Sequence, residues 1–147
     1  MNTFNSTWPP ASPVMHTQPA SPDFGWLRSL PHRDYLEMDA CDTAPGIARR
    51  WLVRLLGEWS LEDHADDAML VASELISNSV AETGKPGWVR RPPVGLRLHG
   101  GPSVLVIQVW DAVLGAPLPR AAAPDEESGR GLAIVAGLSA SCGFLLL

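Results

Sequence analysis

The most regular pattern of apolar residues in this chain covers residues 65–83, ADDAMLVASELISNSVAET. Its apolar positions recur at intervals of one, four and five residues, which is typical of a helix with one buried face. These positions are Leu70, Val71, Leu75, Ile76 and Val80. Glu74 and Asn78 lie four residues apart, so they project from one side of this helix, one turn above the other.

A helical wheel places Glu74 and Asn78 on the face that also carries Leu70, Val71 and Leu75. A buried polar group without a partner costs roughly 1–3 kcal/mol, and a buried charge costs more. We therefore expect the carboxylate and the amide to meet another part of the protein or a ligand. The alternative is an ordinary helix whose polar residues only border its apolar face.

A second amphipathic helix precedes this one. Thr43 is a candidate N-cap, and Pro45 falls in the first turn, where a missing N–H costs nothing. Apolar residues follow at helical spacing up to residue 59, namely Ile47, Trp51, Leu52, Leu55, Leu56 and Trp59. Gly84 and the sequence GKPG after it predict where the following helix ends.

Strand patterns flank the two helices. Residues 32–38 form a short candidate strand, residues 94–99 alternate between apolar and other residues, and residues 103–110 are rich in Val and Ile. The turn signal Gly-Gly-Pro at 100–102 joins the last two into an antiparallel hairpin. A loop at 111–129, a helix that carries Leu132 to Leu138 and an apolar strand at 143–147 complete the order. This order predicts an α+β fold, a two-layer sandwich with three helices over a mixed, mostly antiparallel sheet whose last strand is truncated.

Composition narrows the choice of protein class. The chain has 147 residues, 46% of them hydrophobic and 18% charged, which suits one globular domain. Residues 1–31 hold six of the fourteen prolines and predict a flexible tail, which leaves residues 32–147 as the domain.

The net charge of −5 argues against a nucleic-acid partner. The sequence shows no signal peptide, no apolar run of about 20 residues and no metal-type cysteine spacing, so we expect a cytoplasmic protein that makes no contact with a membrane.

Three features converge on one kind of chemistry: Glu74 with Asn78 on a helix, Asp111 at a strand end, and Gly129-x-Gly131 opening a helix. In this order and separation, LVASELISNSV resembles the N-box of the GHKL ATPases, the superfamily that contains gyrase, histidine kinases and MutL. VWDAVLGAP resembles their G1 box, and ESGRGLAIV resembles their G2 box. The small anti-sigma-factor serine/threonine kinases and related one-domain ATP-binding regulators of actinomycete type are the most similar members, over residues 39–143.

The resemblance implies the Bergerat ATP-binding fold and a role for each matched residue. Asn78 would coordinate Mg²⁺, Glu74 would act as general base, and Asp111 would accept a hydrogen bond from the adenine amino group. The remaining nucleotide contacts would come from the lid and the helix after it, through Gly115, Gly129, Arg130, Gly131 and Leu132. Backbone N–H groups at the start of that helix suit phosphate.

The chain also departs from the family pattern. Val113 stands where the G1 box has its first glycine, and a positive φ is energetically unfavourable for a β-branched residue. The short ending GFLLL predicts an exposed sheet edge and weakened ATP binding.

By resemblance, we expect an ATP-binding protein that uses Mg-ATP to phosphorylate a serine or threonine of a small antagonist protein, and so controls a sigma factor. Homodimerisation is a further expectation of the resemblance. The alternative is a non-catalytic module that binds the partner without phosphoryl transfer. A histidine-kinase domain is disfavoured, because no helix with a phosphorylatable histidine precedes the pattern.

Overall fold

The computed structural model describes residues 25–84, 90–112 and 130–142. Its elements, in order, are η1 (Gly25–Ser29), β1 (His32–Met38), α1 (Ala44–Glu58), η2 (Glu62–His64), α2 (Ala65–Thr83), β2 (Val94–Gly101), β3 (Val104–Trp110) and α3 (Gly131–Leu138). Three helices and an antiparallel sheet confirm the predicted α+β class. The predicted strand at 143–147 and residues 1–24 of the predicted tail lie outside the described residues.

The sheet has the strand order β1-β2-β3, and both pairings are antiparallel. The hairpin turn is tighter than predicted, because Gly100 and Gly101 still belong to β2 and pair with Leu105 and Val104. Gly100 is needed for packing: a Cβ there would lie 2.9 Å from Cδ1 of Leu61 and 3.0 Å from Trp59. The glycine therefore lets the segment after α1 close over the sheet.

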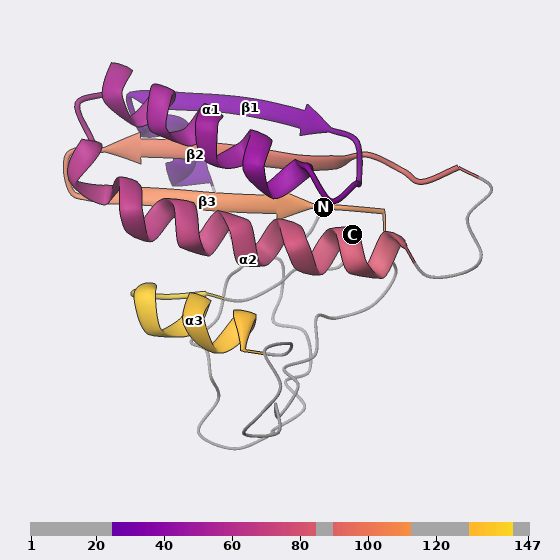
Figure 1. Ribbon diagram of the computed structural model, residues 1–147. Helices are drawn as coiled ribbons and strands as arrows, with labels where there is room; N and C mark the ends of the chain where they lie inside the picture. The colour runs from indigo at the N-terminus through magenta and orange to yellow at the C-terminus, as the bar shows by residue number, and fades with distance from the viewer. Residues whose placement is uncertain (1–24, 85–89, 113–129, 143–147) are drawn as a thin grey trace.

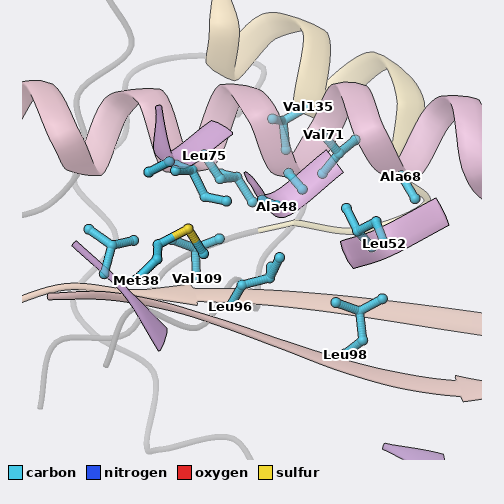
Figure 2. Packing of buried hydrophobic residues seen from close by; sticks show 14 of the residues in the cluster. Met38, Ala48, Leu52, Ala68, Val71, Leu75, Leu96, Leu98, Val109 and Val135 are labelled. Carbon is cyan, nitrogen blue, oxygen red and sulfur yellow. The ribbon is translucent and has the colours of Figure 1, made fainter. Parts of the chain in front are cut away.

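Helices α1 and α2 lie side by side over one face of the sheet (Figure 1). Between the two layers is the hydrophobic core, in which Leu52, Ile76 and Leu96 are fully buried. Figure 2 shows Leu52, Leu75 and Val71 on the helical side of this core and Leu96 and Leu98 on the strand side. Burial of each such side chain contributes roughly 1.5–3 kcal/mol, so the core is the main source of stability.

Helix α3 does not complete this layer over the described sheet. It packs on α2, on the side away from α1, and Figure 1 shows it past β3. Val135 anchors it in the core with 2% of its surface exposed. The three predicted helices are therefore present, and α3 lies beside α2 on the side away from α1.

The helix ends differ in detail from the sequence pattern. Thr43 is the N-cap residue of α1, but its side chain makes no capping hydrogen bond, and its hydroxyl lies 3.1 Å from the Cys41 thiol instead. Pro45 does occupy the first turn. Gly84 ends α2 in a right-handed conformation, with φ of −76°, so this position does not need the positive φ that glycine allows. None of the described helices combines the length and apolar character that crossing a bilayer requires.

The other face of the sheet carries aromatic and polar groups. The rings of Tyr35 and Trp110 stack with centroids 6.1 Å apart, and the Arg97 guanidinium lies 5.5 Å from the Tyr35 centroid. A Cβ on Gly95 would overlap the Trp110 indole, so this glycine gives the ring its place. Leu27 of η1 is buried, which means that the packed structure begins before residue 32.

His99 is buried on β2, diagonally across from Gln108 of β3, with 7% of its surface exposed. Burial lowers its pKa below the usual value, and the positive charges of Arg97 and Arg33 lower it further. The Gln108 side chain and the Leu27 backbone, acting as acceptors for the imidazole, raise the pKa and so oppose the shift. Neither the Nδ1 atom of His99 nor the Oε1 atom of Gln108 has a hydrogen-bond partner with good geometry. Burial therefore remains the main cause of the lowered pKa.

We expect His99 to make stability depend on pH. Because its folded-state pKa is depressed, the unfolded chain binds the proton more readily, so the free energy of unfolding falls as the pH drops below about 6.5, the unfolded value. Urea denaturation between pH 8 and pH 5 should show a smaller decrease in the free energy of unfolding for His99→Gln than for the parent chain. His64→Gln, at an exposed histidine, is the control and should retain the parent profile. Identical slopes in all three chains would contradict the prediction.

Candidate functional site

Helix α2 positions the predicted pair of polar residues. Its buried face contains Ala68, Ala72 and Ile76, and Glu74 and Asn78 are both half-buried at the border of that face. Val71 and Leu75 are buried as expected, but Leu70 is 43% exposed. The helical wheel therefore predicted the centre of the apolar face too close to Leu70. Glu74 and Asn78 lie at the edge of the buried face.

Glu74 meets the beginning of α3. A Cβ built on Gly131 would lie only 2.5 Å from Oε2 of Glu74 and 3.5 Å from its Cβ. The carboxylate therefore fills the space beside the first residue of α3. No positive φ is involved at Gly131, so the glycine is required by this contact and not by backbone conformation.

The start of α3 is suited to negative charge. Arg130 is its N-cap residue and provides no side-chain capping bond, and its carbonyl accepts the first helical hydrogen bond, from Ile134, at 3.0 Å. The first N–H groups of a helix have no partner within the helix, and its dipole favours an anion there. Glu74 supplies one such anion, and a phosphate would suit the same position.

Asp111 lies where β3 ends, two residues after buried Val109. It is half-buried. Val109 and Leu75 belong to the same core cluster, and Figure 2 shows both at the interface between α2 and the sheet. The strand end that carries Asp111 and the helix that carries Glu74 and Asn78 are thus joined through the core.

The remaining predicted residues divide into three groups. Arg130 is exposed at the start of α3. Leu132 is 7% exposed and packs in the core, so only its backbone remains as a candidate nucleotide contact. Gly115 and Gly129 lie outside the described residues, as does Val113.

The carboxylate oxygens of Glu74 lie beside the start of α3, and the amide oxygen of Asn78 belongs to the next turn of α2. Mg²⁺ takes oxygen ligands, keeps several waters and needs only one or two protein groups when it is bound with phosphates. No cluster of three or more His, Cys, Asp or Glu side chains occurs in the described ranges, so a site built wholly from such protein ligands is not found there. Glu74 and Asn78 therefore fit a shared protein–phosphate site better than an all-protein metal site.

The sequence pattern assigned Gly131 to phosphate approach and missed its contact with Glu74. Both residues were prominent in their own motifs, but nothing in the spacing of residues 74 and 131 predicts that they touch. The contact arises because α3 packs on α2.

We expect Glu74 and Gly131 to be energetically coupled. In an otherwise helical position, Gly→Ala favours the helix by up to about 1 kcal/mol. Gly131→Ala should lose this gain while Glu74 is present, because the new Cβ displaces the carboxylate, and should recover at least about 0.5 kcal/mol in a Glu74→Ala background. Chemical denaturation of the four chains measures this coupling.

Gly137→Ala is the matched control in the same helix, because nothing lies within 4 Å of its Cβ position. Its effect on the free energy of unfolding should be the same with and without Glu74. Additive effects for Gly131→Ala and Glu74→Ala would contradict the contact.

The chain matches no protein-family model, and no curated protein matches it. The features that bear on its function are the contact between Glu74 and Gly131, the position of Asn78 one helical turn from Glu74, and the motifs in which these residues occur.

Proposed function

We propose that this chain is a cytoplasmic ATP-binding regulator that uses Mg-ATP to phosphorylate a serine or threonine of a small antagonist protein, as anti-sigma-factor kinases do. The observation that supports this function best is the contact between the Glu74 carboxylate and the first residue of α3, Gly131. It joins the helix with the N-box pattern to the helix that opens with the G2 pattern. Asn78 lies one helical turn from Glu74 on the same side of α2.

In this proposal, ATP binding divides among three groups. The Asn78 side-chain oxygen would hold Mg²⁺, which would neutralise part of the phosphate charge when bound. The free N–H groups of the first turn of α3 hold phosphate oxygens. Asp111 accepts a hydrogen bond from the adenine amino group, which would favour adenine over guanine because guanine presents a carbonyl oxygen at that position.

Glu74 would carry the chemical step. Its carboxylate accepts the proton of the attacking serine or threonine hydroxyl, whose oxygen forms a bond to the γ-phosphorus. The bond from the γ-phosphorus to the bridging oxygen breaks, and ADP leaves with that electron pair. A homodimer, an antagonist protein and a sigma factor as its downstream target belong to the same proposal.

We expect saturable ATP binding that depends on Asn78 and Asp111. Titration calorimetry with Mg-ATP should show at least about tenfold weaker binding in Asn78→Ala, because one metal ligand is lost. Removal of Mg²⁺ should weaken ATP binding by the parent chain more than ATP binding by this variant. Ser77→Ala, at the exposed neighbouring residue, should bind as the parent does. Asp111→Ala should reduce the preference for ATP over GTP. Absence of saturable binding at millimolar ATP would exclude the proposed nucleotide site.

The same contact favours a second function, a module that binds a partner without phosphoryl transfer. Glu74 already places a negative charge at the start of α3, where a phosphate would need to bind. Val113 also replaces a glycine of the lid motif. In such a module, Glu74 would stabilise α3 and take no part in chemistry.

Transfer of the γ-phosphate distinguishes the two functions. With radiolabelled ATP and a candidate antagonist protein, the kinase predicts labelled antagonist, and Glu74→Gln should reduce the rate by about 10²–10⁴-fold while ATP binding persists. A stable complex with unlabelled antagonist would instead support the binding module. Equal transfer by the parent chain and Glu74→Gln would exclude Glu74 as the base.

A further inference from the structure

The sheet has an outer face, which points away from α1 and α2, and part of this face is covered. Side chains of a strand alternate between the two faces, and Leu96 and Leu98 of β2 belong to the core beneath the helices. His99 therefore belongs to the outer face, as does Gln108, which precedes the core residue Val109 on β3. Yet only 7% of His99 and 4% of Gln108 is exposed. A further segment of the chain must shield these two side chains from solvent.

The covering segment is residues 25–30, which we call the strap. Leu27 is the buried residue of η1, but it is not part of the core cluster on the helical side of the sheet. Its backbone carbonyl lies close to the His99 imidazole. Leu30 lies over Gly101, because a Cβ on this glycine would be 3.1 Å from Cδ2 of Leu30. Gly101 is two residues beyond His99 on β2, so the strap follows the outer face of this strand.

The strap covers one end of the outer face and leaves the other end open. Arg97 lies two residues before His99 on the same face and is half-buried. Tyr35, which pairs with Arg97, is 37% exposed. The low exposure of His99 is therefore due to the strap, and not to the sheet itself.

The charges around His99 disfavour a proton on its ring. Arg97 of β2 and Arg33 of β1, the residue directly opposite His99, both act on the ring as positive charges. β3 carries no charged side chain, and the charged residue of η1 is Arg28, which is exposed. Glu37, the acidic residue on this face of β1, lies four positions along the ladder from Arg33. A protonated ring beneath the strap would thus be held away from water between two arginines.

We propose that the strap is a proton-sensitive cover: protonation of His99 releases residues 25–30 from the outer face while the sheet and the core stay folded. β2 cannot move away from the strap, since it is paired with β1 on one side and with β3 on the other. Release of the strap gives the charged ring access to water and costs only the burial of Leu27 and the contact of Leu30 with Gly101. The hydrogen bond from the Ser29 hydroxyl to a backbone carbonyl lies within the strap, so release does not break it.

Release changes what the outer face presents to solvent. Water reaches Nδ1 of His99 and Oε1 of Gln108, which have no hydrogen-bond partner of good geometry in the described structure. These groups then continue the open surface that carries the stacked rings of Tyr35 and Trp110. Because burial lowers the pKa of His99 below its usual value of 6.5, release belongs to mildly acidic conditions.

NMR of the full chain between about pH 8 and about pH 4.5 tests this release. The nuclear Overhauser effect between a Leu30 methyl group and Hα of Gly101 should weaken at least about tenfold as the pH falls. Its midpoint should coincide with that of the His99 ring and lie below about 6.5. The methyl signals of Leu52, in the core, should keep their shifts. Protonation of His99 with an unchanged Leu30–Gly101 effect would overturn the proposal, and so would collapse of the core signals at the same midpoint.

His99→Gln removes the titrating group and keeps a neutral polar side chain. The strap should stay in place over the whole pH range in this variant. His64→Gln, at an exposed histidine, is the control and should release the strap as the parent chain does. Release in His99→Gln at the midpoint of the parent chain would assign the response to another group and overturn the proposal.

The coupling is reciprocal, so loosening the strap should change the titration of His99. In Leu27→Ala the proton affinity of His99 should rise at least about threefold, because the ring is then more accessible to water. Leu70→Ala makes the same exchange at a leucine of α2 that is 43% exposed, and it should leave the titration unchanged. An equal rise in both variants, or none in Leu27→Ala, would contradict the coupling. If Leu27→Ala unfolds, the titrations of the parent chain and of His99→Gln still decide the matter.

Discussion

The burial of α2 between α1, α3 and the sheet is the constraint on which the rest of the structure depends. Small residues make this possible: Ala44 and Ala48 of α1 and Ala68 and Ala72 of α2 are at most 3% exposed. Side chains of this size let two helices approach closely while larger residues such as Ile76 fill the core toward the strands. With three neighbours in contact, α2 has little freedom to rotate, and the directions of its polar residues are fixed by its apolar ones.

The candidate site follows from that fixed orientation. Glu74 and Asn78 lie at the border of the buried face, and α3 packs against the same border through Gly131. A carboxylate at the start of a helix stabilises that helix, typically by 0.3–1 kcal/mol. If Glu74 also acts as a base, one side chain serves both stability and chemistry, and replacing it changes α3 as well as the reacting groups. Conservative exchange to glutamine separates these effects better than truncation to alanine.

Elements with strong local patterns could be predicted from the sequence. The bounds of α2 and β1 agree with the predicted ranges 65–83 and 32–38, because apolar spacing and turn residues specify them locally. Features that depend on packing could not be predicted. The exposure of Leu70, the place of α3 beside α2 and the contact of Gly131 with Glu74 all depend on which helix lies next to which. At the site, Glu74, Asn78 and Asp111 were identified by motif, while their roles in ATP binding and catalysis stay predictions.

The pairing of β1 with β2 has a consequence for the order in which the chain folds. Met38 pairs with Val94, so this ladder closes a loop that contains both α1 and α2, whereas β2 and β3 are joined by a two-residue turn. Closing a long loop costs entropy before its contacts form, and local hairpins and helices form in microseconds. The β2–β3 hairpin and the α1–α2 pair should therefore assemble first, and the arrival of β1 should set the folding rate of the domain.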